Sequence, residues 1–195
     1  MLGVCQELAA SVGAQVSMSK EGRLRLLKVI EPTGSPVVTI TPADYMLGSL
    51  QISERTTVLS GMRLGYCKNW TTQDSLETGI PTEHKDLFAK EWLTVSSNDA
   101  VVATEYRLHG EPEQQDTLLL NGTTAQAESD RRLNLWKKQR TVYRLTGYSH
   151  LLTLELGSIV ELKVPRFGLD NGKLGQIISI QSDWIGRRVT LEVLV

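Results

Sequence analysis

The stretch from residue 141 to residue 195, "TVYRLTGYSHLLTLELGSIVELKVPRFGLDNGKLGQIISIQSDWIGRRVTLEVLV", decides the fold class. Aliphatic residues alternate with polar ones at a period of two, which is the pattern of strands that bury one face. Four short strands of this kind indicate a small antiparallel β-barrel or sandwich. They are predicted at Leu152–Leu156, Val160–Val164, Ile178–Ile180 and Val189–Val195.

The glycines between these strands favour turns. Turn residues occur at 157–158, 168–172 and 183–186, and the pair Asn171-Gly172 is typical of a two-residue hairpin. Glycines beside Lys and Arg can also cradle a phosphate, but such a loop leads from a strand into the N-terminus of a helix. Here the glycines lead into "QIISI", which is itself a strand pattern, so the sequence favours turns over a phosphate site.

Two main short helices are predicted outside the strands. Residues 2–13 carry apolar side chains at spacings of three and four, and Gly13 is a suitable helix stop. Residues 123–140 begin with Thr123 as N-cap and Gln126 as its capping-box partner, and place acids early and bases late. We expect a narrow buried stripe on this second helix, formed by Ala125, Ser129, Leu133 and Trp136.

The other segments predict further β-structure. A hairpin is expected over 15–30, a short strand near 37–41, strands on both sides of Ser60-Gly61, and another strand in "AVVATEYRLHG" from residue 100. Residues 79–92 favour part loop and part short helix. The fold class is therefore α+β and β-rich. We expect a helix-plus-hairpin module over 1–50, a mixed region over 51–122, and a helix with a β-barrel over 123–195, with boundaries that can interleave.

Composition limits the function classes. Lys and Arg number 21 and Asp and Glu number 22, so the formal net charge is -1, which is not the balance of a dedicated nucleic-acid binder. Any DNA contact is expected to be transient and non-specific. Cys5 and Cys67 are expected to be reduced thiols, because small secreted domains usually carry several pairs. The N-terminus lacks the features of a signal peptide, and no apolar run is long enough for a membrane span, so we expect a soluble protein made in a cytoplasm.

No catalytic, cofactor-binding or metal-ligating residues are predicted, and the chain is not expected to be an enzyme. His84, His109 and His150 have no His or Cys at a metal-ligand spacing. Glu83, Asp86 and Glu91 could be proposed as acid-base carboxylates, but surface charge explains them better. The basic run "RRLNLWKKQR" (131–140) follows acids on one amphipathic helix, which favours a solvated or inter-subunit face over a phosphate site.

The four tryptophans are spread along the chain. No two of them lie close together on one predicted strand face, so anchoring in a core or interface is favoured over a sugar-stacking platform. They are Trp70, Trp92, Trp136 and Trp184.

The order of features resembles the C-terminal part of hub, or tail-tip, proteins of long-tailed bacteriophages and related prophage or gene-transfer-agent tails. A charged helix and a strand precede the turn Leu156-Gly157-Ser158-Ile159-Val160, where Ser158 replaces the usual Asp, and the turn Arg166-Phe167-Gly168-Leu169. The segments "ADYMLGSLQISER" (43–55), "MRLGYCKNW" (62–70) and "GIPTEHKDLFAKEW" (79–92) are also similar to the middle region of these proteins.

The resemblance implies a structural role in a virion tail. Such hubs have barrel domains like those of tail-tube proteins and form a ring that connects the tube to distal tip proteins. The implied partners are the chain itself, as a homotrimer when full length, together with tail-tube, tape-measure and tip or fibre proteins. The resemblance implies neither a cofactor nor catalytic residues.

Two other functions stay open at this point. One is a carbohydrate- or cell-wall-binding β module at a tail tip or cell surface, which requires exposed aromatic side chains among Trp70, Trp92 and Trp184. The other is an enzyme such as a wall hydrolase, which requires paired carboxylates.

Overall fold

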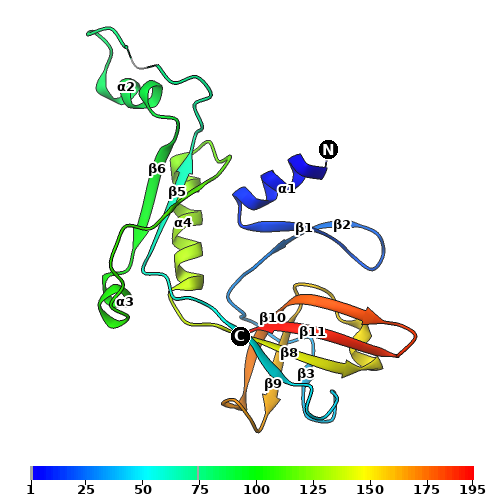
Figure 1. Ribbon diagram of the computed structural model, residues 1–195. Helices are drawn as coiled ribbons and strands as arrows, with labels where there is room; N and C mark the ends of the chain where they lie inside the picture. The colour runs from blue at the N-terminus through cyan, green and yellow to red at the C-terminus, as the bar shows by residue number, and fades with distance from the viewer. Residues whose placement is uncertain (1, 74) are drawn as a thin grey trace. The chain divides into compact units, whose positions relative to one another are not determined.

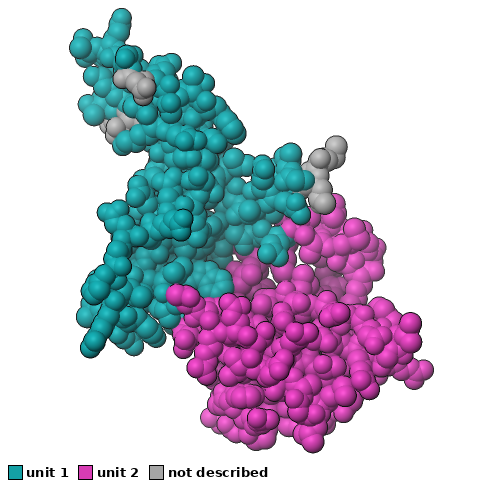
Figure 2. Space-filling view, viewed as in Figure 1, with its two compact units in different colours: residues 1–15, 58–138 teal, residues 16–57, 139–195 magenta. Residues whose placement is uncertain are grey.

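The computed structural model describes residues 2–73 and 75–195, without the side chains of Leu2, Glu83 and Asp86. The chain forms two compact units, shown in different colours in Figure 2. Unit 1 comprises Met1–Gln15 and Val58–Lys138, and unit 2 comprises Val16–Thr57 and Gln139–Val195. The three-part division predicted at residues 50 and 122 stays a prediction.

Unit 2 is built on one six-stranded sheet (Figure 1). Its strands, in spatial order, are β3 (Thr39–Ile40), β9 (Ile159–Val164), β10 (Leu169–Asp183), β11 (Arg188–Leu194), β8 (Thr141–Tyr148) and β4 (Gln51–Arg55). Neighbouring strands are antiparallel except β3 and β9, which run parallel. Over the described residues the sheet is open and ends at β3 and β4, which gives a small sandwich-like β domain without a closed barrel.

A continuous aliphatic core holds unit 2 together. The alternation predicted for β9 is confirmed, and that for β11 holds as far as Val193, because the inward side chains are buried: Val160, Leu162, Val164, Val189, Leu191 and Val193. Leu194, expected on the outward face, is buried as well. They pack with Ile40, Tyr143, Leu145 and Leu169 from other strands. Burial of this much apolar area is the main favourable term in folding, at about 25 cal/mol per Å².

Three expectations for unit 2 were wrong in detail. No strand forms over Leu152–Leu156: residues up to 153 belong to the 3-10 helix η1 (Ser149–Thr153), which buries Leu151 and Leu152 together. The hairpin turn after β9 lies at residues 165–168, whereas Gly172 lies inside β10 at a φ of 75°. A bulge between Ile177 and Ser179 changes the alternation, so that Ile177 is buried in place of Ile178.

The predicted N-terminal hairpin is confirmed. Strands β1 (Ala14–Met18) and β2 (Leu24–Lys28) form a two-stranded sheet, with Gly22 in the left-handed conformation of the connecting turn. Three of its apolar side chains are open to solvent: Met18, Leu24 and Leu26 are all more than two-thirds exposed.

Unit 1 combines helices with a three-stranded sheet. The sheet has the order β6 (Leu93–Asn98), β5 (Gly61–Tyr66), β7 (Gln114–Asp116), and helix α4 (Gly122–Trp136) packs on β5 and β6. The shorter helices are α1 (Leu2–Ser11), α2 (Thr82–Ala89) and α3 (Ala100–Glu105). Met62, Leu64 and Leu133 form its apolar cluster, with Leu59, Val95 and Trp136 packed against it.

Several local expectations for unit 1 were also wrong. The "AVVATEY" segment is helix α3 rather than a strand, because the Asp99 carboxylate accepts hydrogen bonds from the N–H groups of Val101 and Val102 and so caps a helix. Asn121, not Thr123, is the N-cap of α4, and α4 ends at Trp136 instead of continuing to residue 140. On α1, Ala9 is buried but Leu8 is exposed.

The stripe on α4 is broader than expected. Ala125, Ser129 and Leu133 are buried as predicted, but Glu128 and Leu135 are buried as well, and Trp136 is only partly so. The expected α+β, β-rich class is confirmed. The two main helices expected from the sequence correspond to α1 and α4, the longest helices among the described residues.

Candidate interaction surfaces

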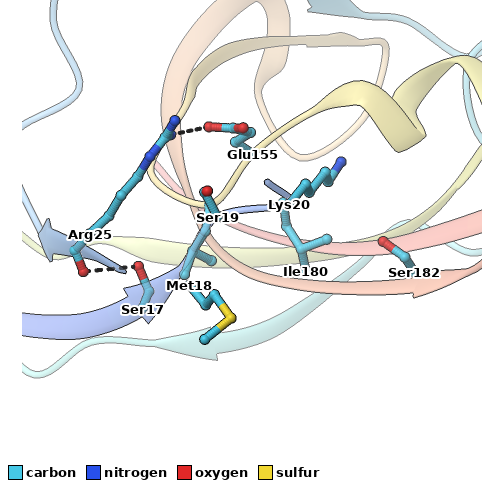
Figure 3. Close-up of a pocket in the computed structure, with 9 residues that line it drawn as sticks. Ser17, Met18, Ser19, Lys20, Arg25, Glu155, Ile180 and Ser182 are labelled. Atoms are coloured by element: carbon cyan, nitrogen blue, oxygen red, sulfur yellow. Dashed lines mark hydrogen bonds and ion pairs between the residues drawn. The ribbon is translucent and has the colours of Figure 1, made fainter. Parts of the chain in front are cut away.

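A pocket of about 250 Å³ lies between the β1–β2 hairpin and β10 of unit 2 (Figure 3). Its apolar walls come from Met18, Leu156 and Ile180. Its polar lining comes from Ser17, Ser19, Lys20, Arg25, Glu155 and Ser182.

The charged groups of this pocket are engaged within unit 2. Lys20 donates through Nζ to the carbonyls of Leu152 and Leu154, and Arg25 forms an ion pair with Glu155. Because these contacts join the hairpin to the region around η1, their first role is to hold the hairpin on unit 2. The pocket is therefore an amphipathic recess beside an anchored hairpin.

A buried amide fixes the segment that follows the hairpin. Gln176 is 3 % exposed; its Oε1 accepts from the N–H of Ile30 at 3.0 Å, and its Nε2 donates to the carbonyl of Lys28 at 3.1 Å. The side chain thus bonds the backbone of residues 28–30 as a neighbouring strand would. An amide buried in this way is favourable only because its donor and acceptor are both satisfied.

A buried charge cluster organises unit 1. Glu128 is 7 % exposed; its carboxylate accepts from Arg131 at 2.7 Å and from Arg132 at 2.8 Å. Arg132 also donates to the carbonyls of Ala10 and Ser11 at the C-terminal end of α1. Much of the basic run 131–140 is thus used in ion pairs inside the chain, which also include Lys137–Asp99 and Arg140–Glu31.

A second cluster of unit 1, called here the tryptophan cluster, consists of Lys68, Trp70, Glu91 and Trp92. The Nζ of Lys68 lies 4.4 Å from the ring centroid of Trp70 and 5.1 Å from that of Trp92. It also lies 3.6 Å from Oε1 of Glu91. Trp70 is 79 % exposed, and the proximity of two tryptophans to one lysine was not predicted from the sequence.

Among the described side chains, the histidines and carboxylates considered from the sequence do not come together in one site. His84 lies on α2 and His109 lies beyond α3, and both are exposed. His150 in η1 is within hydrogen-bond distance of Asp44. The side chains of Glu83 and Asp86 lie outside the described residues, and Glu91 pairs with Lys68. Over the residues that the structure describes, no group of three His, Cys, Asp or Glu side chains could hold a metal ion, and Cys5 and Cys67 are free thiols.

Asp44 has a perturbed acidity. Burial alone would raise its pKa, but the carboxylate accepts from the N–H and the hydroxyl of Thr41, both at 2.7 Å, and lies 3.0 Å from Nε2 of His150. These hydrogen bonds and the nearby His150 outweigh burial and hold the pKa of Asp44 below its ordinary value. The adjacent Tyr45 is buried, which raises the pKa of its phenol.

Another exposed apolar feature is the turn between β10 and β11. Trp184 and Ile185 are 66 % and 99 % exposed, and the turn is shaped by a hydrogen bond from the N–H of Gly186 to Oδ1 of Asp183.

In the described part of the chain, no helix is long and apolar enough to cross a membrane.

Comparison with known proteins gives a shared fold. No family model matches the sequence, and no curated protein matches it. The structure is similar to a protein in the virion of a native gene transfer agent particle, with a TM-score of 0.59 and 16 % identity over 95 % of this chain and 37 % of that one. It is also similar to a tail protein from Neisseria meningitidis MC58, with a TM-score of 0.51 and 12 % identity over 100 % of this chain and 54 % of that one.

The chain thus spans between about a third and about a half of the length of these proteins. At such identities the likeness shows a common fold, and the fold is one found in tail and virion proteins.

Proposed function

We propose that the chain is a non-enzymatic structural component of a phage-type tail, and that it forms part of the tail-tip or baseplate hub ring that connects the tail tube to distal tip proteins. The observation that carries this proposal is the similarity of nearly the whole chain to part of a gene-transfer-agent virion protein. The resemblance of residues 43–55, 62–70 and 156–169 to hub proteins also supports it.

The surface of unit 2 also supports assembly. The six-stranded sheet ends at β3 and β4 over the described residues, and an exposed strand edge is a template for pairing with another chain. The β1–β2 hairpin presents Met18, Leu24 and Leu26 to solvent, and a two-stranded hairpin is only marginally stable without cover. A ring neighbour that packs on the hairpin removes this apolar area from water.

The proposed partners follow from this role. The full-length protein forms a homotrimer and contacts tail-tube, tape-measure and tip or fibre proteins, without a cofactor and with at most transient, non-specific DNA contact. The protein is made in the bacterial host cytoplasm and acts in the virion tail.

Native mass spectrometry of the chain, alone and with its tail-tube protein, tests the proposal. We expect a homo-oligomer or a complex with the tube protein. The double variant Leu24→Ser/Leu26→Ser should weaken assembly by at least about tenfold without loss of folding, since interface energy concentrates in a few apolar anchors. The control Leu47→Ser changes a side chain that is 94 % exposed outside the hairpin, and should assemble normally.

A protein that stays monomeric at tens of micromolar and binds no tail protein would contradict the proposal. So would equal assembly by the hairpin variant and the wild type, because the hairpin would then have no role in the ring.

A further inference from the structure

The tryptophan cluster lies where two strands of unit 1 continue beyond their ladder. β5 and β6 pair antiparallel up to Tyr66 and Leu93, and the N–H of Asn69 then donates to the carbonyl of Glu91 at 2.8 Å. Residues 68–70 and 91–92 therefore stay side by side. Their side chains come from segments that are far apart in sequence but fixed to each other by the backbone.

Hydrogen bonds make the segment around Trp70 rigid. The side-chain amide of Asn69 donates to the carbonyls of Leu87 and Phe88 at 3.2 and 3.0 Å, and its Oδ1 accepts from the N–H of Thr71 at 3.0 Å. The N–H of Gln73 donates to the carbonyl of Phe88 at 2.9 Å. The exposed indole is therefore held on an ordered backbone, which lowers the entropy lost when a ligand is bound.

The chemistry around the indole is polar and electrically balanced. Lys68 and Glu91 form an ion pair beside the ring, so this pair carries no net charge. The sequence neighbours of Trp70 are Asn69, Thr71 and Thr72. A protein interface of ordinary size covers about 800 Å² on each side and has an apolar centre. The exposed apolar surface here is smaller: it consists of the indole of Trp70 and the partly exposed side chains of Leu87 and Phe88, on the segment that Asn69 holds.

We propose that the tryptophan cluster is a binding site for a neutral saccharide. A pyranose ring has one face of C–H groups and a rim of hydroxyls. The C–H face packs on the exposed indole of Trp70, and the hydroxyls donate to Glu91 and accept from Lys68. Small-ligand sites generally combine an aromatic surface with a few placed polar groups in this manner. This function is additional to tail assembly and does not depend on it.

Titration of ¹⁵N-labelled protein with cellobiose, maltose and N,N′-diacetylchitobiose, each in turn, tests the site through the four indole N–H signals. We expect at least one disaccharide to shift the signals of Trp70 and Trp92 with a dissociation constant on the order of 1 mM, as is usual for a shallow site. The signals of Trp136 and Trp184 should not move.

Two variants decide whether Trp70 is responsible. Trp70→Ala should weaken binding by at least about tenfold, while the matched control Trp184→Ala, which removes another highly exposed tryptophan, should keep the dissociation constant within about twofold. Glu91→Gln keeps an acceptor oxygen and should retain binding within about fivefold, whereas Glu91→Ala should lose more. Thermal unfolding by circular dichroism confirms that each variant is folded.

The proposal is overturned if none of the three disaccharides moves the Trp70 signal at about 20 mM, well above the expected dissociation constant. It is also overturned if Trp70→Ala binds as well as Trp184→Ala. If the Trp70 signal moves only when a tail protein is added, the cluster is a protein-docking site instead. None of these outcomes affects the assembly test, which uses the β1–β2 hairpin of unit 2.

Discussion

The two units are similar in length but are stabilised by different interactions. In unit 2, sixteen buried residues of the described chain form one apolar cluster, whereas the apolar cluster of unit 1 has three. Five of the seven buried polar residues in the described chain lie in unit 1: Ser11, Ser97, Thr117, Glu128 and Ser129.

The polar residues of unit 1 form networks. The hydroxyl of Ser97 donates to Oδ1 of Asp130 at 2.6 Å and lies 2.8 Å from the hydroxyl of Ser129, which donates to the carbonyl of Met62 at 3.2 Å. Thr117 donates to the carbonyl of Gly65. Stability in unit 2 therefore depends mainly on apolar volume, and stability in unit 1 depends on partners for buried polar atoms.

The largest effect is expected from a cavity in unit 2. Leu162 is fully buried in β9, and Leu162→Ala should lower the free energy of unfolding by about 3–4 kcal/mol through lost burial and the cavity left behind. Urea unfolding measures the change. Leu47→Ala, at a highly exposed leucine, is the control and should change it by less than about 0.5 kcal/mol. A loss below about 1.5 kcal/mol for Leu162→Ala would contradict an apolar basis for unit 2.

A single polar change should have the next largest effect, and in unit 1. Glu128→Gln leaves Arg131 and Arg132 without their buried counter-charge and should cost about 2–3 kcal/mol, somewhat less than a fully buried pair because both arginines reach solvent. Faster hydrogen exchange of the α4 backbone amides in Glu128→Gln would measure this loss of stability. Glu105→Gln changes an exposed carboxylate of α3 and should leave that exchange unaltered. Equal behaviour of the two variants would remove the distinction between the units.

A change of backbone conformation in β10 should lower the free energy of unfolding by less than Leu162→Ala or Glu128→Gln does. Gly172 has a φ of 75°, so Gly172→Val should cost about 2 kcal/mol, because a β-branched residue resists the left-handed region. Gly172→Asn is the matched control, since asparagine tolerates this region, yet its Cβ meets the same Glu161 side chain. Thermal unfolding should give Gly172→Asn a free energy of unfolding at least about 1 kcal/mol greater than that of Gly172→Val. Equal losses would mean that contact with Glu161, not φ, is decisive.

The smallest expected effect is electrostatic, and it tests whether apolar contacts alone stabilise unit 2. Because the pKa of Asp44 is lowered in the folded state, its contribution to stability is complete above its unfolded pKa and is lost as the pH falls through the folded pKa. Asp44→Asn should therefore reduce the loss of stability between about pH 5 and pH 2 by up to about 1 kcal/mol. Urea unfolding across this range measures it, with exposed Asp170→Asn as the control. An unchanged acid profile for Asp44→Asn would show that the Thr41 and His150 contacts contribute nothing.

The β-rich class could be predicted because β9 and β11 each bury one face of an ordinary strand. The prediction failed where a different local rule applied. Leu151, Leu152 and Leu154 are all buried, which a helical turn allows and an alternating strand does not. In α3, β-branched residues suggested a strand, but the cap supplied by Asp99 and the tertiary context outweighed that weak preference.

The tryptophan cluster could not be predicted from the chain alone. Its members come together only because β5 and β6 pair in one particular register, and β6 itself, with the polar sequence "LTVSSN", was not predicted. The buried state of Glu128 was missed for a related reason. Its position early in a charged helix is typical of a surface residue, and its burial follows from α1 and the two arginines around it.

The middle segment of the chain leaves and rejoins unit 2 at neighbouring points. The N–H of Thr56 donates to the carbonyl of Arg140 at 2.9 Å, and the N–H of Leu59 donates to the carbonyl of Trp136 at 3.0 Å, so residues 56–59 and 136–140 run alongside each other. When the two ends of an inserted segment lie next to each other, the strand order of the domain that contains the insertion is unchanged. All six strands of the large sheet accordingly come from residues outside 58–138, so the strand order of that sheet does not depend on the length of the segment between Thr57 and Gln139.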